Sequence, residues 1–239
     1  MGWVTMSKKI LTQKTDDITI GSFSGENGKF DWDLYKGVQQ KTSYRKIDNK
    51  GPSISRLTLL ANHIKENIKN IKFGICHGTR NGVEQKHLRE LLNIDVIGTE
   101  IADGSGKFDY QIQWDFHDVK DEWVNNVNFI FSNSLDHSYD PVYCLSQWMK
   151  CIKDDGIIYL QWDNGYTNKK LDGTYVKNIK SANASTGAGA DCFLATIDGY
   201  QQIVEDAGNG EWVMEFPEEL DFKNENNGKY FIIRRKNES

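Results

Sequence analysis

The chain has 239 residues, of which 38% are hydrophobic and 12% aromatic, and its formal net charge is -5. This hydrophobic content excludes wholesale disorder, and the length suits one α/β domain with additions better than two full domains. The acidic balance and the lack of a long basic block argue against a general electrostatic grip on nucleic acid.

The four cysteines have no C-x-x-C spacing, so the sequence predicts no metal site and a reducing, cytoplasmic environment. Cys144 and Cys151 lie seven residues apart, which fits core packing on one helix face. No apolar run approaches the roughly 20 residues needed to span a bilayer, and no signal-peptide pattern opens the chain. We therefore expect neither a membrane partner nor a secreted protein.

Residues 1–50 are polar and irregular, apart from a short apolar patch at Ile18–Ile20. They also hold an aromatic cluster, Phe30, Trp32, Tyr35 and Tyr44. We interpret residues 1–53 as an N-terminal extension that could cover a cleft. Pro52 and Ser53 then introduce a helix over about 54–69, whose apolar residues follow helical spacing.

From residue 54 onward, strand and helix patterns alternate, which predicts one domain over 54–239. The expected strands are 71–76, 95–100, 109–114, 127–132, 157–162, 211–216 and 229–234, and the further helices are 82–92, 142–152 and 196–206. Such alternation favours a doubly wound, mainly parallel α/β sheet of seven strands with helices on both faces. The connection 217–228 is too short for a crossover helix, so the last strand should run in reverse. Residues 163–192, rich in Gly, Asn, Ser and Ala, are predicted to form a loop.

The turn after the first strand of this domain contains Cys-His-Gly-Thr-Arg-Asn-Gly and opens a helix. Backbone can approach a ligand closely at glycine, and a helix start offers free N–H donors and a positive dipole end. Gly78 is the best candidate for the closest approach, whereas Gly74 lies within the strand. Because strand-to-helix turns often carry glycines for steric reasons, this pattern alone is a weak signal.

Two acidic residues strengthen the evidence for a ligand site at this turn. Glu100 ends the second strand of the domain, where a carboxylate can accept both hydroxyls of a ribose. Asp115 follows the third strand and can accept from an adenine amino group, while Phe116 offers an apolar face to the ring. The alternative for each acid is a solvated residue at a loop start, but three matched features at three successive strand ends favour an adenosine cofactor.

The fourth strand leads into Ser132-Asn133, which places polar groups at the carboxyl edge of the sheet. Asp136 and His137 follow, and His137 could take a proton from a substrate hydroxyl with Asp136 orienting it. The alternative is a helix-entry loop in which His137 packs or contacts substrate. Asp140 as N-cap before Pro141 fits that structural interpretation.

With these motifs, residues 70–235 resemble a class I S-adenosylmethionine-dependent methyltransferase. The resemblance maps the family's glycine-rich motif onto Gly74–Arg80, its ribose acid onto Glu100 and its adenine acid onto Asp115. It implies a Rossmann-like fold, S-adenosylmethionine as cofactor, and a reversed seventh strand. The implied cofactor residues are Gly74, Cys76, His77, Gly78, Arg80, Glu100, Asp115, Phe116 and Asn133.

The sequence departs from the family's acid-x-Gly-x-Gly-x-Gly motif. Gly74, Cys76, Gly78 and Arg80 occupy the positions of the acid and of the three glycines, so only the middle glycine is kept. The strand's usual acid is missing, so contact with the cofactor's amino group must come from elsewhere. Arg80 could reach the methionine carboxylate.

The leading hypothesis is a methyltransferase that acts on an oxygen of a small polar acceptor, such as a sugar or glycan, with His137 and Asp136 as catalytic residues. The aromatic residues at and after the end of the fifth strand, Trp162, Tyr166 and Tyr175, suit sugar stacking, although they suit other rings equally. One alternative is a nucleic-acid methyltransferase, but the Asn/Asp-Pro-Pro-Tyr/Phe segment is absent. Another is an inactive module that binds the cofactor. An NAD-dependent oxidoreductase is disfavoured because no Gly-x-Gly-x-x-Gly is present.

Overall fold

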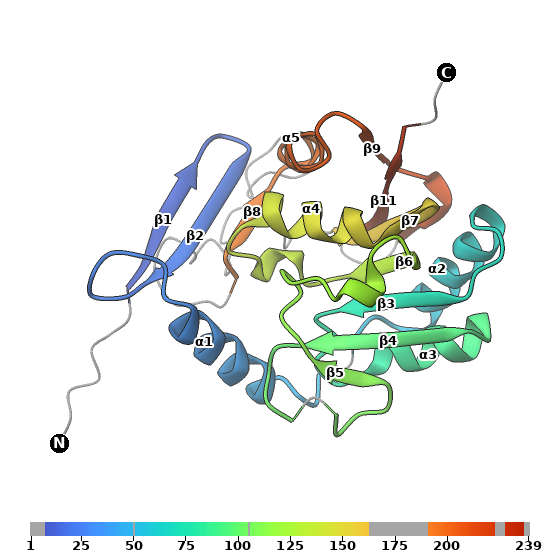
Figure 1. Ribbon diagram of the computed structural model, residues 1–239, viewed down its shortest axis with the longest axis horizontal. Coiled ribbons are helices and arrows are strands. Elements are labelled where there is room, and N and C mark those ends of the chain that lie inside the picture. The colour runs from blue at the N-terminus through green and yellow to red at the C-terminus, as the bar shows by residue number, and fades with distance from the viewer. Residues whose placement is uncertain (1–7, 50, 105, 163–190, 223–227, 237–239) are drawn as a thin grey trace.

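The computed structural model describes residues 8–49, 51–104, 106–162, 191–222 and 228–236. Within them an eight-stranded sheet has the order β10-β11-β7-β6-β3-β4-β5, with β9 beside β11 (Figure 1). Its strands are β3 Phe73–His77, β4 Asp95–Glu100, β5 Gln111–Gln113, β6 Val127–Ser132, β7 Ile152–Trp162, β9 Trp212–Glu215, β10 Asp221–Phe222 and β11 Gly228–Arg235. Strands β3 to β7 pair in parallel, and β11 is antiparallel to β7. The mainly parallel sheet with a reversed terminal strand is thus confirmed; the short β10 adds an eighth strand.

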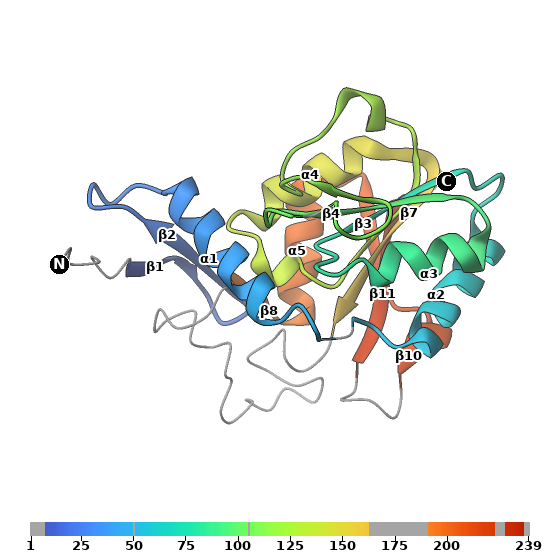
Figure 2. The ribbon, with the colours of Figure 1, turned by 90° about the horizontal axis from the view of Figure 1, so that it is seen from below.

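Helices cover both faces of this sheet (Figure 2). Helices α2, Ile54–Asn67, and α3, Val83–Leu92, share one core cluster, and α4, Pro141–Cys151, and α5, Ile197–Ala207, share the other. Side chains alternate along the strands. Ile130 packs on the α4 and α5 side, whereas its neighbours Phe129 and Phe131 pack under α2 and α3. This alternation produces the doubly wound arrangement.

Side-chain caps set the starts of α2 and α4. Ser53 Oγ accepts from the backbone N–H of Arg56 at 3.4 Å at the start of α2. Asp140 Oδ1 accepts from the N–H of Tyr143 at 3.0 Å, with Pro141 in the first turn of α4. The N-cap that the sequence predicts for Asp140 is therefore present.

The chain passes directly from α4 into β7, which begins at Ile152 rather than at residue 157. Residues 153–156, which lie between the expected helix 142–152 and the expected strand 157–162, form an irregularity within this strand, because the pairing shifts from Val127 with Ile152 to Phe129 with Ile157. At Gly156 an added Cβ would lie 2.7 Å from the carbonyl oxygen of Asn128, so the bulge needs a glycine there.

The N-terminal residues form more regular structure than the sequence predicts. Strands β1, Lys8–Lys14, and β2, Ile18–Ser24, form an antiparallel hairpin, and β2 pairs with β8, Phe193–Ala195. Helix α1, Trp32–Arg45, follows and lies beside the carboxyl ends of β3 and β4 (Figure 1). Residues 163–190 of the expected loop lie outside the described residues.

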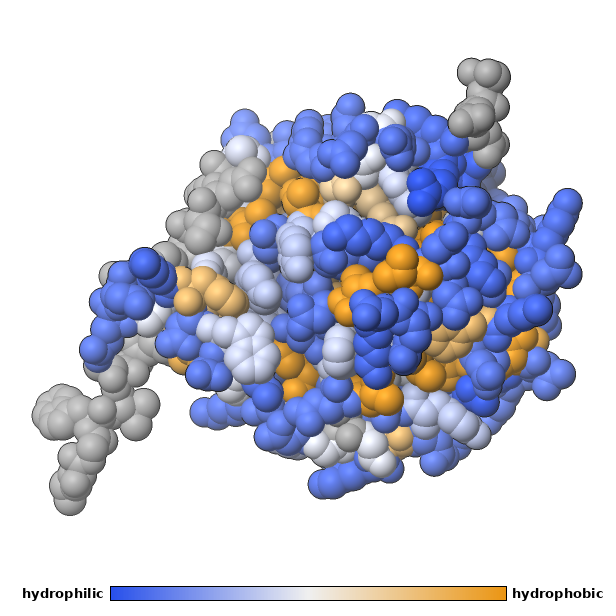
Figure 3. Space-filling model, in the orientation of Figure 1, coloured by the Kyte–Doolittle hydropathy of each residue, from blue (hydrophilic) through white to orange (hydrophobic). Residues whose placement is uncertain are grey.

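The face shown in Figure 3 is mostly hydrophilic, with small apolar patches between the polar side chains. Among the helices of the described ranges, none is both long enough and apolar enough to cross a bilayer.

Gly74 is required by packing. An added Cβ would lie 2.2 Å from the ring of Phe129, which is fully buried. We expect Gly74→Ala to lower the free energy of unfolding by about 1–3 kcal/mol, measured by urea denaturation. Gly37→Ala in α1 is the control, because nothing lies within 4 Å of an added Cβ there and alanine favours a helix. Equal effects of the two substitutions would contradict the packing role.

Candidate functional site

A cavity of about 50 Å³, here called the first cavity, lies between the carboxyl edge of the sheet and α1. Helix α1 contributes Tyr35, Gln39, Thr42 and Ser43 to its wall. The turns that follow the strands contribute Gly78, Arg80, Glu100, Ile101, Asp115, Phe116, Ser134 and His137. Residues that are far apart in the sequence thus meet where parallel α/β sheets bind ligands.

The turn after β3 is shaped by backbone bonds to the end of β4. The N–H groups of Gly78 and Thr79 both donate to the carbonyl oxygen of Thr99, at 2.9 and 3.0 Å. Gly78 has a φ of +73°, and an added Cβ would lie 2.6 Å from Ser134. Glycine is therefore needed for both the backbone conformation and the close approach.

Glu100 lines the cavity with a carboxylate that two backbone N–H groups hold. Oε2 accepts from Arg80 N at 2.9 Å, and Oε1 accepts from Ala102 N at 3.0 Å. These bonds fix the carboxylate at the cavity wall, with the side chain mostly buried. A fixed acceptor in this position suits a ligand that brings hydroxyl donors.

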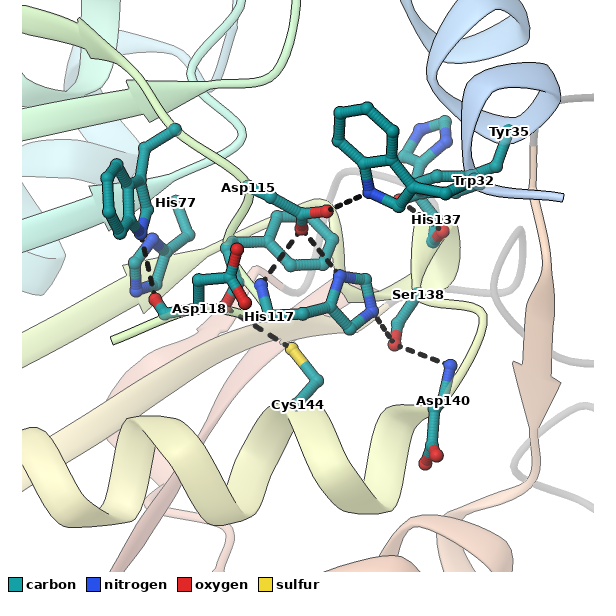
Figure 4. Close-up of polar contacts among 12 residues, drawn as sticks. Trp32, Tyr35, His77, Asp115, His117, Asp118, His137, Ser138, Asp140 and Cys144 are labelled. Atoms are coloured by element: carbon teal, nitrogen blue, oxygen red, sulfur yellow. Dashed lines mark hydrogen bonds and ion pairs between the residues drawn. The ribbon is translucent and has the colours of Figure 1, made fainter. Parts of the chain in front are cut away.

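Asp115 belongs to a chain of polar contacts (Figure 4). Its Oδ1 accepts from the backbone N–H of His117 at 3.0 Å and lies 2.7 Å from His117 Nδ1, and His117 Nε2 lies 2.8 Å from Ser138 Oγ. The indole N–H of Trp32 in α1 donates to Asp115 Oδ2 at 3.2 Å. Burial pushes the pKa of Asp115 up, but the hydrogen bonds and charge of His117 outweigh it and hold the pKa below its usual value.

The contacts of Asp115 with His117 and of His117 with Ser138 resemble those of an Asp-His-Ser catalytic triad. Ser138 is completely buried and His117 is 1% exposed, and neither lines the first cavity. A substrate could not reach the hydroxyl. This network instead keeps Asp115 ionised and oriented at the cavity wall.

His137 lines the first cavity beside two acids. Its Nδ1 lies 3.7 Å from Asp191 Oδ1, and ligand atoms of Asp136, His137 and Asp191 all lie within 4.8 Å of one another. Neither Nδ1 nor Asp136 Oδ1 has a hydrogen-bond partner. Burial raises the pKa of Asp136 to about 7, against the opposing charge of His137. This spacing would also suit a divalent cation.

Four of the residues predicted for the cofactor do not line the first cavity. Gly74 packs against Phe129, and Cys76 is fully buried in the core under α2 and α3. His77 stacks on Trp148 with ring centroids 4.7 Å apart. Asn133 lines a second cavity, described below, and donates to Glu84 Oε1 at 3.3 Å.

Sequence reasoning missed the α1 wall, the His117–Ser138 contact and Asp191. The aromatic cluster at Trp32 and Tyr35 was the available signal for α1. His117 lies two residues after Asp115 in Trp-Asp-Phe-His, but its contact with Ser138 depends on tertiary packing. Nothing in the local sequence marks Asp191.

No protein-family model matches the sequence, and no curated protein matches it significantly. Solved structures do resemble the fold. The sugar N-methyltransferase KedS8 from Streptoalloteichus sp. ATCC 53650 matches with a TM-score of 0.56 and 12% identity, over 82% of this chain and 92% of that one. The plantazolicin methyltransferase BpumL, in complex with SAH, matches with a TM-score of 0.55 and 12% identity, over 85% of this chain and 96% of that one.

The citrinin polyketide synthase CMeT domain matches with a TM-score of 0.52 and 12% identity, over 75% of this chain, which spans 51% of that chain's length. Another match, from Rhodobacter sphaeroides, has 9% identity and is described as an alcohol dehydrogenase. At these identities the likeness establishes fold alone. The chain has the fold of the class I S-adenosylmethionine-dependent methyltransferases.

His77 should make stability depend on pH. Burial lowers its pKa to about 3, so the folded protein keeps the ring neutral while the unfolded chain binds a proton below about pH 6.5. Its contribution is present above pH 6.5 and is lost as the pH falls, by about 2 kcal/mol at pH 5. His77→Gln should lose less stability between pH 7.5 and pH 5 in urea denaturation. Equal losses of stability in the wild type and in His77→Gln would show that another group controls the pH dependence between pH 7.5 and pH 5.

Proposed function

We propose that the protein is an S-adenosylmethionine-dependent methyltransferase that methylates an oxygen of a small polar acceptor, such as a sugar or glycan. The observation that carries this proposal is the pair of ionisable carboxylates, Glu100 and Asp115, at the ends of neighbouring parallel strands around Gly78. The fold agrees with it. We further propose residues 1–53 as a cap on a catalytic domain of residues 54–239.

The residues of the first cavity fit the adenosine part of this cofactor. Glu100 presents its carboxylate for the ribose hydroxyls, and Asp115 presents one for the adenine amino group beside the ring of Phe116. Gly78 leaves room for close approach of a ligand to the turn. Because pockets for ligands of this size usually enclose about 300–1,000 Å³, α1 must move away from the sheet edge for the cofactor to enter.

When bound, S-adenosylmethionine supplies a sulfonium methyl group for in-line displacement by the acceptor oxygen. The protein has to align the acceptor and remove its hydroxyl proton. His137 Nε2 is the proposed base. Its Nδ1 faces the carboxylates of Asp136 and Asp191, which stabilise the ring once it carries the proton.

All four cysteines are free and buried. This usage suits a reducing compartment, and we propose the cytoplasm.

Calorimetric titration with S-adenosylmethionine tests the cofactor. We expect binding by the wild type, and at least tenfold weaker binding by Glu100→Gln, because charge-assisted hydrogen bonds contribute about 1.5–3 kcal/mol each. Asp95→Asn, at the exposed start of the same strand, should bind as the wild type does. No binding at millimolar ligand would reject both the enzyme and an inactive cofactor-binding module.

His137→Ala should reduce turnover by roughly two to four orders of magnitude, because it removes the proposed base. Turnover would be measured as S-adenosylhomocysteine release in a screen of acceptors that includes sugars and nucleic acids. Cofactor affinity should change little.

Gln202→Ala, at an exposed residue of α5 that lines neither cavity, is the control. If turnover of His137→Ala falls only a few-fold, His137 is not the base. A chelator should leave the wild-type rate unchanged; activation by added Mg²⁺ or Mn²⁺ would indicate a cation at Asp136, His137 and Asp191 and would contradict the base.

A further inference from the structure

A buried carboxylate lies in the first turn of α3, next to the turn after β3. Glu84 is 3% exposed, and its Oε1 accepts from Asn133 Nδ2 at 3.3 Å. Its Oε2 is buried without a hydrogen-bond partner. An unsatisfied buried acid is costly to a fold, so it needs an explanation other than packing.

Arg80 provides a cation near this acid without pairing with it. The half-buried Arg80 lines the first cavity, and its charge lowers the pKa of Glu84. Across the described ranges, no carboxylate lies within ion-pair distance of the Arg80 guanidinium. The hydrogen bonds of Arg80 there are those of its own backbone N–H and carbonyl groups. Two complementary charges thus flank one region and neither satisfies the other.

The space beside them is the second cavity, of about 690 Å³, which shares Arg80 with the first cavity and is also lined by Asn133 and Gly51. Glu84 lies directly behind Gly51, where an added Cβ would be 2.8 Å from Glu84 Oε1. The carboxylate thus contacts two residues of the cavity wall, Gly51 and Asn133. The region therefore places a carboxylate and a guanidinium at the wall that the two cavities share through Arg80.

We propose that Glu84 and Arg80 together bind an α-amino acid group, Glu84 taking the ammonium and Arg80 the carboxylate. This inference rests on the proposed function, because the ligand is the methionine end of S-adenosylmethionine. β3 carries Gly74 and its neighbours but no acid, and position 72, just before it, is a lysine. Glu84, on the following helix, supplies the negative charge from a different element.

The competing explanation for Glu84 is structural, since its bond to Asn133 ties α3 to the end of β6. The two explanations differ in which ligand they affect. A binding role acts only on ligands that have the amino acid group. A structural role acts equally on ligands that lack it.

The test is calorimetry on the full chain with two ligands, S-adenosylhomocysteine and 5′-methylthioadenosine, which lacks the amino acid group. Glu84→Gln should weaken binding of S-adenosylhomocysteine about 10- to 100-fold, the loss expected for a hydrogen bond to a charged group, and leave 5′-methylthioadenosine within twofold. Glu90→Gln, at an exposed acid on the same helix, should change neither.

Unchanged binding of S-adenosylhomocysteine by Glu84→Gln, or equal weakening for both ligands, would overturn the proposal. If the wild type binds neither ligand, the proposed function fails first and this site with it. If the wild type binds 5′-methylthioadenosine alone, the adenosine site stands and the amino acid site is rejected.

A measurement on the wild type covers the case in which Glu84→Gln does not fold. Burial raises the pKa of Glu84 to about 7; the hydrogen bond from Asn133 and the charge of Arg80 lower it, and the charge of Glu100 raises it. Glu84 in turn helps to raise the pKa of the buried Cys76 thiol, which stays neutral in this range. The ionised form binds ammonium, so the affinity for S-adenosylhomocysteine should rise between pH 6 and pH 8. In the proposed site Glu100 contacts both ligands, so its titration affects both affinities equally. The ratio of the affinity for S-adenosylhomocysteine to that for 5′-methylthioadenosine therefore isolates the effect of Glu84. A ratio that stays constant between pH 6 and pH 8 would overturn the proposal.

Discussion

The attachment of the turn after β3 to the end of β4 is the constraint on which the site depends. Backbone N–H groups of Gly78, Thr79 and Arg80 bond to Thr99 and Glu100, so two strand ends and one helix start move as a unit. This fixes the direction of the Glu100 carboxylate. It also forces Gly78 against Ser134, which joins the end of β6 to the same unit. Both cavities are built around this turn.

Much of the fold could be predicted from the sequence because its signals are local. The strands at Asp95–Glu100 and Val127–Ser132 have the predicted bounds, and the short link before β11 required a reversed strand. Helix α1 was missed because its buried stripe is Tyr35, Gln39 and Ser43, of which two are polar. A hydrophobic pattern does not detect a helix whose buried face is largely polar.

The site was partly predictable for the same reason. Glu100 ends β4, and Asp115 and Phe116 come within three residues of the end of β5, so their place at the sheet edge comes from topology alone. Glu84, His117 and Ser138 are polar residues whose burial depends on packing between distant elements, and sequence spacing carries no sign of it. Such buried polar groups specify geometry more than they add stability, because each must find its partner.

The bond from Trp32 to Asp115 has a consequence for affinity. The indole N–H of Trp32 donates to Asp115 Oδ2, so in the proposed adenosine site helix α1 and the adenine amino group would compete for the same carboxylate. In the proposed enzyme, the fraction of molecules with α1 withdrawn multiplies the intrinsic association constant. A change that loosens α1, even one distant from both cavities, would then alter the apparent Kd without touching a ligand contact.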